Sequence, residues 1–124
     1  MESNPLSQSV KQSLVFGAFK EWKEASPLIA DFFRQRNREL TRKPMIFHAE
    51  GFLKTLFWVN NKPFEDDLSE WKERINGLNH LPVNAIERLS FIFDQPDHYQ
   101  SYIQLSELFT EWEKKSVILM RRKA

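Results

Sequence analysis

The fold of this chain follows first from residues 44–59, whose sequence is PMIFHAEGFLKTLFWV. An α-helix over this stretch turns by 100° per residue and gathers most of its apolar side chains on one side. These residues are Met45, Ala49, Phe52, Leu53 and Leu56. Phe47 and Trp58 fall on nearly the opposite side, next to Gly51. A helix that is apolar on both sides is expected to lie at the centre of a helical protein.

Two helices are expected before this stretch, and prolines mark their boundaries. The first covers about residues 7–24 and ends at Ser26-Pro27, which also begins the second, because a helix tolerates proline at its first position. The second helix is expected to bury Leu28, Ile29, Phe32 and Phe33. Pro44 begins the central helix in the same way and forces Lys43 out of the helical region.

Three more helices are expected after the central one. Residues 60–63 form a turn, and the acidic residues 65–67 are expected to cap a short helix that carries Leu68, Trp71 and Ile75. The next helix covers about residues 83–93, and the last runs from Asp97 to about Met120. The last helix is the longest, and its apolar residues recur in steps of three and four.

Composition and spacing together predict an all-α, single-domain bundle of about six helices with a long C-terminal helix. The chain has 124 residues, of which 41% are hydrophobic and 28% are charged, as in one compact domain. Short connections favour packing of consecutive helices against one another. This domain is expected to cover residues 1–124, with a short flexible N-terminus at about 1–6 and a basic C-terminal tail at about 121–124.

The composition also excludes several classes of site. The absence of cysteine excludes disulfides, a thiol nucleophile and thiolate metal ligands. The glycines, Gly17, Gly51 and Gly77, are too few and too dispersed for a phosphate-binding loop. No signal sequence is recognisable, and no apolar stretch reaches the ~20 residues that span a bilayer. A cytoplasmic protein without a membrane span is therefore expected.

Neither a metal site nor a cofactor is predicted. His48, His80 and His98 fall on different segments and lack the spacing of metal ligands. The acidic residues 65–67 could in principle bind Mg²⁺, but capping of a helix is the favoured interpretation. No catalytic residue is assigned, because no serine lies in a nucleophile motif.

Glu50 lies at the edge of the most apolar stretch and is expected to need a partner. Arg36 falls among the apolar residues of the second helix, so an ion pair between Arg36 and Glu50 is predicted, chiefly as a structural contact. The alternative is an enzyme whose pocket is built on Glu50 and His48. This alternative is the least favoured, because helical geometry places His48 well away from Glu50 around the axis.

A row of cations precedes the central helix. Arg34, Arg38 and Arg42 are spaced by four, which on one helix repeats positive charge along one face, and Lys43 follows them. Arg121 and Arg122 form a second basic group near the C-terminus. A solvated helix face is the favoured interpretation, and binding of nucleic acid or another anionic partner is the alternative.

Phe47 and Trp58 remain as the aromatic residues that the predicted core does not absorb. On a shared face around Gly51 they could line a groove for a helix or peptide, or they could pack against another helix. The leading functional hypothesis is a non-enzymatic interaction module that binds a protein partner or itself through such apolar anchors. Weak association with nucleic acid through the arginine row is the second hypothesis.

Three stretches carry a resemblance to a known family. They are LKTLFWVNNKP at residues 53–63, LPVNAIERL at 81–89, and residues 99–105. As a set they resemble the YpoC-like proteins of Gram-positive bacteria, over most of the chain from about Leu28 onward. The resemblance implies a cytoplasmic bacterial helical protein, and it transfers no activity, cofactor or catalytic residue to individual positions of this chain.

Overall fold

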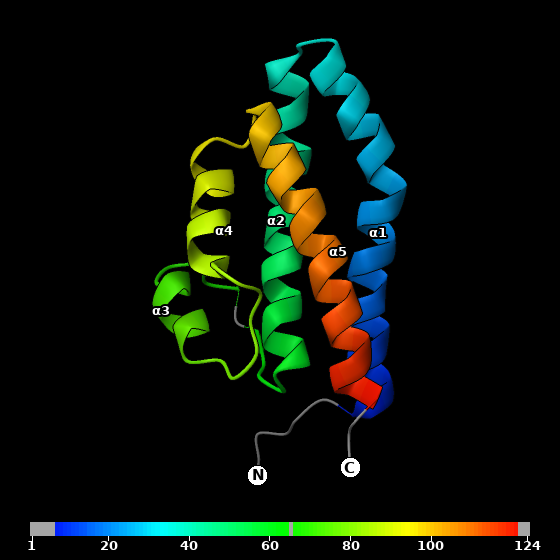
Figure 1. Cartoon of the computed structure of the whole chain (residues 1–124), viewed down its shortest axis with the longest axis vertical. Coiled ribbons are helices and arrows are strands. Elements are labelled where there is room, and N and C mark those ends of the chain that lie inside the picture. The colour runs from blue at the N-terminus through cyan, green and yellow to red at the C-terminus, as the bar shows by residue number, and fades with distance from the viewer. Residues whose placement is uncertain (1–6, 65, 122–124) are drawn as a thin grey trace.

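A computed structural model describes residues 7–64 and 66–121, and it folds them into five α-helices without a strand (Figure 1). The helices are α1 (Gln8–Arg34), α2 (Arg38–Val59), α3 (Trp71–Asn76), α4 (Ala85–Asp94) and α5 (Tyr99–Arg121). The predicted all-α class and the long C-terminal helix are confirmed, but the prediction that the last helix is the longest is wrong, because α1 has 27 residues and α5 has 23. Residues 1–6 and 122–124, which include most of the predicted tail, lie outside the described residues, whereas Arg121 is the last residue of α5.

The predicted helix boundaries at Ser26-Pro27 and at Pro44 are wrong, and three predicted helices are in fact two. Pro27 lies inside α1, and Pro44 lies inside α2. An interior proline removes one hydrogen bond and costs a helix about 3 kcal/mol. Buried residues continue past each proline, however, with Trp22 and Ile29 on either side of Pro27. Tertiary burial of this continuous apolar stripe offsets the local cost of the proline.

The chain turns instead at residues 35–37, where Arg36 adopts a left-handed conformation with a φ of 58°. The N–H of Arg36 donates to the carbonyl of Phe33 at 2.9 Å, and the N–H of Asn37 donates to that of Phe32 at 3.1 Å. This pair of bonds is a Schellman motif, whose left-handed residue is usually glycine. The side chain of Asn37 then accepts the N–H of Leu40 and caps α2.

The other end of α2 has the same geometry. Asn61 has a φ of 61°, and the N–H groups of Asn61 and Lys62 donate to the carbonyls of Trp58 and Phe57 at 3.0 and 2.9 Å. The Nζ atom of Lys11 in α1 donates to Oδ1 of Asn61 at 2.8 Å. The two long helices are therefore joined by a turn at one end and by a side-chain hydrogen bond at the other.

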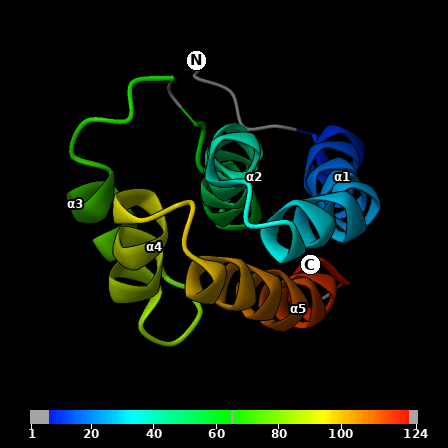
Figure 2. The same ribbon diagram turned by 90° about the horizontal axis from the view of Figure 1, so that it is seen from above.

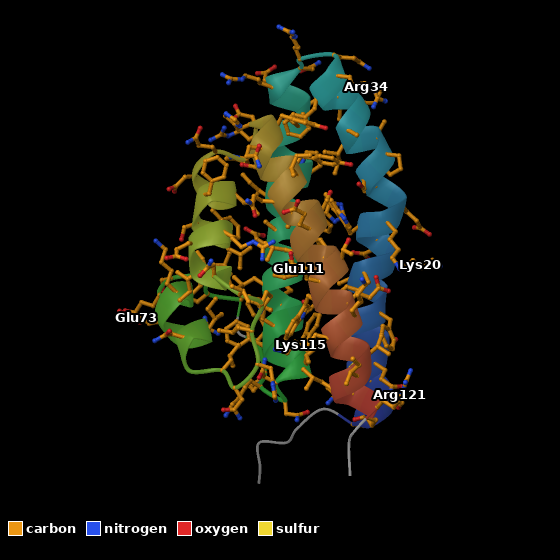
Figure 3. All side chains as sticks on the ribbon, viewed as in Figure 1. Lys20, Arg34, Glu73, Glu111, Lys115 and Arg121 are labelled. Carbon is orange, nitrogen blue, oxygen red and sulfur yellow. The ribbon has the colours of Figure 1, made fainter. Side chains whose placement is uncertain are left out.

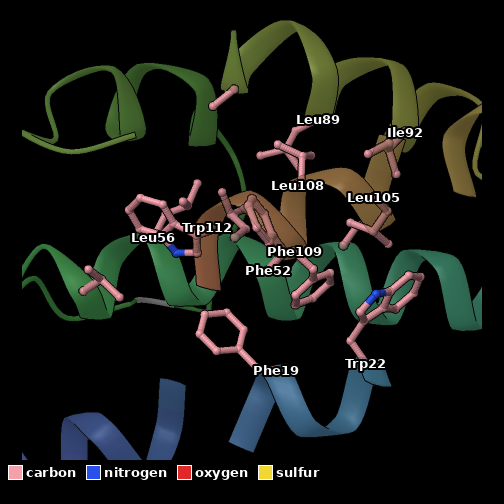
Figure 4. Close-up of a cluster of buried hydrophobic side chains, with 14 of the residues drawn as sticks. Phe19, Trp22, Phe52, Leu56, Leu89, Ile92, Leu105, Leu108, Phe109 and Trp112 are labelled. Carbon is pink, nitrogen blue, oxygen red and sulfur yellow. The ribbon is translucent and has the colours of Figure 1, made fainter. Parts of the chain in front are cut away.

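The core lies between α1, α2, α4 and α5, and α2 contacts the other three (Figures 2 and 4). α3 packs on the outer side of α4. Figure 4 shows that all four core-forming helices contribute buried apolar side chains. The largest of the fully buried side chains include Phe52, Leu56, Leu89, Leu105 and Trp112. The prediction that residues 44–59 form a central helix is confirmed.

Several shorter predictions need correction. The second predicted helix was expected to bury Leu28, but this side chain is 58% exposed, because α1 turns it away from the core. The acidic residues do not cap α3, which begins only at Trp71. Within this acidic group, Asp66 is exposed, and Asp67 accepts the N–H of Ser69 at 2.9 Å. Glu65 lies outside the described residues.

Candidate functional site

A groove lies between the side chains of α1 and α2, the two long helices that run side by side in Figures 1 and 2. We call it the α1–α2 groove, and its volume is about 300 Å³. Its lining comprises Ser13, Leu14, Gly17, Ala18 and Glu21 of α1, Phe47, His48, Glu50, Gly51, Lys54 and Trp58 of α2, and Phe109 of α5. The groove therefore brings together most of the α2 residues that the sequence analysis names as candidates for a pocket or a binding surface.

Two helical glycines keep the groove open. Gly17 lies within α1 and Gly51 lies within α2, and both line the groove. A Cβ atom added at either position would meet nothing within 4 Å. The space at these positions is therefore empty within the described residues, and packing inside the chain does not require glycine there.

The predicted pair of aromatic residues lies in this groove. Phe47 is 61% exposed, and its ring and that of His48 form an edge-to-face pair with centroids 5.0 Å apart. Trp58 is half-buried and packs partly against the core. Both side chains line the same concave surface, as their angular positions on the helix predict. The sequence prediction missed the α1 half of the lining, because angular position on α2 does not show which helix lies beside it.

His48 is the most buried polar residue of the groove. Its ring and that of Trp22 form an edge-to-face pair with centroids 5.5 Å apart, and His48 is 8% exposed. Burial lowers the pKa of His48 below its ordinary value, and the nearby carboxylate of Glu21 opposes this shift. His48 and Glu50 line the same groove, but no hydrogen bond or ion pair joins their side chains in the described part of the chain.

The predicted ion pair between Arg36 and Glu50 is wrong. Arg36 lies in the turn before α2, whereas Glu50 lies deep within α2 and lines the groove. At a rise of 1.5 Å per residue, Glu50 is about 18 Å along the axis from the first residue of α2. Among the described residues, no ion pair connects the two. The prediction failed because it assumed that Arg36 belongs to a helix face.

The predicted arginine row is divided between two helices. Arg34 ends α1 and pairs with Asp31 at 3.0 Å, while Arg38 and Arg42 lie on α2. Arg42 pairs with Asp97 at 3.4 Å. Lys43 follows Arg42 within α2 and is exposed. Arg121 is exposed at the end of α5, and Arg122 lies outside the described residues.

A second concave surface lies beside the turn that joins α1 to α2. We call it the hairpin-end pocket; its volume is about 510 Å³, and it is lined by Phe33, Arg36, Asn37, Arg38, Thr41, Asp97, His98 and Tyr99. The sequence prediction included Arg38 but missed Tyr99, which is 54% exposed. The spacing of Tyr99 and Tyr102 was the available signal, because residues three apart are neighbours on a helix surface.

A network around Arg88 was also missed. Its guanidinium group donates two hydrogen bonds to the carboxylate of Glu111, each 2.9 Å long, and a third to Gln104 at 3.0 Å. The bonded Arg88 side chain lowers the pKa of Glu111, and Glu111 in turn raises the pKa of Arg88. Because these contacts join α4 to α5 on the surface, we assign them a structural role.

Two further classes of feature are absent from the described ranges, 7–64 and 66–121. They contain no group of three or more histidine, aspartate or glutamate side chains that could hold a metal ion. Nor does any helix in them combine the length and the apolar character required to cross a membrane.

Comparison with known proteins identifies the family. The YpoC-like protein family model matches residues 12–124. Over 97 residues the chain is 29% identical to a curated relative, the "Uncharacterized protein YpoC" of Bacillus subtilis (strain 168). The match covers 77% of this chain and 58% of that relative's length. No solved structure matches the chain significantly. Since the family match extends over almost all of the sequence, the chain belongs to the YpoC-like protein family.

Proposed function

We propose that this chain is a non-enzymatic interaction module whose α1–α2 groove accepts an amphipathic helix of a partner protein. The partner helix would place apolar side chains against Phe47 and Trp58 and a lysine or arginine near Glu21 and Glu50. Amphipathic helices bind grooves in this way through anchors three or four residues apart.

The two glycines of the groove carry the proposal. Glycine within a helix costs about 0.5–1 kcal/mol relative to alanine. At Gly17 and Gly51 a Cβ atom would meet nothing within 4 Å, so no internal contact compensates for this cost. Both glycines line the groove in which Phe47 is 61% exposed. The close approach of an external helix gives a physical reason for small residues at both positions.

The charges of the groove define the partner further. Glu21 and Glu50 line it, against one cation, Lys54. The Lys54 ammonium already lies over the ring of Phe64, 5.7 Å from its centroid. The groove thus offers two carboxylates beside exposed apolar surface, which complements a basic amphipathic helix.

Site-specific photocrosslinking tests the proposal. A benzophenone amino acid replaces Phe47 in one protein and Ile118 in a control, and cross-linked peptides from cells are identified by mass spectrometry. Ile118 is a matched control, because it is 51% exposed and lies on α5, outside the groove. Cross-links from position 47 are expected to fall on one amphipathic segment rich in lysine or arginine.

Binding of the identified segment as a purified peptide provides the quantitative test. Phe47→Ser is expected to weaken binding by about tenfold or more, as for a truncated apolar anchor, whereas Ile118→Ser leaves it unchanged. Gly51→Leu is expected to block the groove as well. Equal cross-linking from positions 47 and 118, or unchanged affinity of Phe47→Ser, contradicts the proposal. Light scattering that shows dimers lost in Phe47→Ser would identify a second copy of the chain as the occupant instead.

A further inference from the structure

We propose that the hairpin-end pocket binds a nucleotide of single-stranded nucleic acid. Arg36 and Arg38 would contact its phosphates, and Tyr99 would stack on its base. The pocket is lined by other residues than the α1–α2 groove, so this inference is independent of the proposed function.

The two arginines are available to a ligand. Both are exposed and line the pocket, and within residues 7–64 and 66–121 neither is joined to a carboxylate by an ion pair. The neighbouring Arg34 and Arg42, by contrast, are paired with Asp31 and Asp97. Because Arg42 offsets the charge of Asp97, the carboxylate that lines the pocket, the arginines leave the pocket positive. Guanidinium groups in this setting favour phosphate, to which they can donate two parallel hydrogen bonds.

Tyr99 supplies a preformed aromatic platform. One side of its ring stacks on Tyr102, with centroids 5.8 Å apart and an angle of 19° between the planes. Phe33 meets both tyrosines at 5.7 and 5.8 Å, and the Tyr102 hydroxyl lies 2.8 Å from Oγ of Ser26. These contacts hold the ring while Tyr99 remains 54% exposed. An exposed ring of fixed orientation suits base stacking, which accepts every base.

The shape of the pocket fits this ligand class. Its volume of about 510 Å³ lies within the usual range for small-ligand sites, about 300–1,000 Å³. Cations and an exposed aromatic ring lie in one concavity, so phosphate and base can be contacted together. A base inside a duplex is already stacked on both faces and cannot reach Tyr99, which favours a single strand.

The backbone conformation of Arg36 supports a role for its side chain in binding a ligand. Its φ of 58° places it at the left-handed position of the Schellman motif, where glycine is the usual residue. An arginine there is conformationally unfavourable, and its side chain is exposed at the pocket. Strained non-glycine residues persist where another requirement selects them.

Fluorescence anisotropy with a labelled deoxythymidine oligonucleotide of about ten nucleotides tests the inference. We expect binding at low salt that weakens linearly with salt on a double-logarithmic scale. Removing one phosphate contact, in Arg38→Gln or Arg36→Gly, should reduce this slope by about 0.7. Tyr99→Leu should weaken binding at least about fivefold while its salt slope is unchanged.

Matched controls separate a site from general attraction between charges. Arg121→Gln also removes one exposed arginine, but at the opposite end of the molecule, as the positions of Arg34 and Arg121 in Figure 3 show. It should bind like the unchanged protein. Because Arg36→Gly relieves backbone strain, we expect this variant to stay folded, and urea denaturation of the same protein checks that a loss of binding is not due to unfolding. A duplex of equal length should bind more weakly than the single strand.

Each of the following outcomes would overturn the inference: absence of binding to the oligonucleotide at low salt, equal effects of Arg38→Gln and Arg121→Gln, or normal affinity of Tyr99→Leu. Competition with thymidine monophosphate distinguishes a nucleic-acid strand from a free nucleotide as the ligand. Weak competition by the mononucleotide supports a strand as the ligand. Competition as strong as that of the oligonucleotide would overturn the assignment to nucleic acid and identify a free nucleotide as the ligand.

Discussion

At the scale of single residues, Arg36 and Asn61 occupy equivalent left-handed positions at the ends of α1 and α2, with φ values of 58° and 61°. Asparagine tolerates this conformation better than arginine does. We therefore expect Arg36→Gly to raise the free energy of unfolding by about 1 kcal/mol. Asn61→Gly should lower it instead, because this substitution also removes the acceptor of the hydrogen bond from the buried Lys11 ammonium. Urea denaturation measures both changes. A destabilised Arg36→Gly protein would show that the arginine side chain contributes to the fold.

His48 should make stability depend on pH. Burial lowers its pKa in the folded protein, so the unfolded chain binds a proton more readily. The stability associated with a neutral His48 is therefore present above its ordinary value of 6.5 and is lost as the pH falls towards the lower folded value. We expect His48→Gln to flatten the decline in the free energy of unfolding between about pH 7 and about pH 5. An NMR titration that placed the pKa of His48 above 6.5 would contradict this prediction.

At the scale of helices, the position of Pro27 inside α1 predicts that its replacement changes the free energy of unfolding in a definite direction. Pro27 is exposed inside α1 and lacks the N–H that would donate to the carbonyl of Lys23. Pro27→Ala restores this donor and should raise the free energy of unfolding by about 1–2 kcal/mol. Pro63→Ala is the control, because Pro63 is exposed outside any helix, and it should be slightly destabilising. Equal effects of the two substitutions in urea denaturation would refute this account.

The link between α4 and α5 gives a second prediction at this scale. The Arg88 side chain lowers the pKa of Glu111, so the contact stabilises the fold above the ordinary value of 4.5 and loses this effect as the pH falls through the lower folded value. Because the Glu111 side chain is 49% exposed, we expect Glu111→Gln to cost only about 0.5–1 kcal/mol at neutral pH. Glu107, 3.9 Å from Arg88, is the matched control and should matter less. Thermal unfolding at neutral and acid pH should show the difference between Glu111→Gln and the unchanged protein disappear in acid.

Helix type was predictable from the sequence, but helix boundaries were not. Leu105, Phe109 and Trp112 recur in steps of three and four, and all three are buried in α5. Periodicity succeeds here because it reports which side of a helix meets the core. The turn between α1 and α2 has no glycine or proline to mark it, since Arg36 occupies the left-handed position. The prolines that do stand nearby are overridden by tertiary packing.

At the scale of the whole molecule, the failure to predict the turn between α1 and α2 explains which part of the candidate site could be predicted. Phe47 and Trp58 belong to one helix, so their common surface follows from angular position alone. Joining them to Gly17 of α1 requires knowing how two helices are placed side by side, and residues 35–37 determine that placement. Helical periodicity contains no such information, because it describes each helix separately.

The distribution of the core predicts that all five described helices unfold together. α3 is only six residues long, but its Ile75 is fully buried, its Trp71 ring lies 5.5 Å from Phe93 of α4, and its Arg74 guanidinium lies over Phe57 of α2 at 5.0 Å. These contacts tie α3 to the common core, although such a short helix is not stable alone.

Tryptophan fluorescence can test this cooperativity, because Trp71 lies on α3 and Trp112 lies at the centre of α5. Two proteins would be compared in urea, one that retains only Trp71 and one that retains only Trp112, the other tryptophans being replaced by phenylalanine. For each protein we expect the fluorescence transition to coincide with the loss of helical circular dichroism, as in a two-state transition. A Trp71 signal that changes at lower urea than the circular dichroism of the same protein would show instead that α3 detaches first. The two signals are compared within each protein because replacing a buried tryptophan shifts the unfolding midpoint of the whole protein. Fluorescence and circular dichroism can have different midpoints in one protein only if part of it unfolds separately.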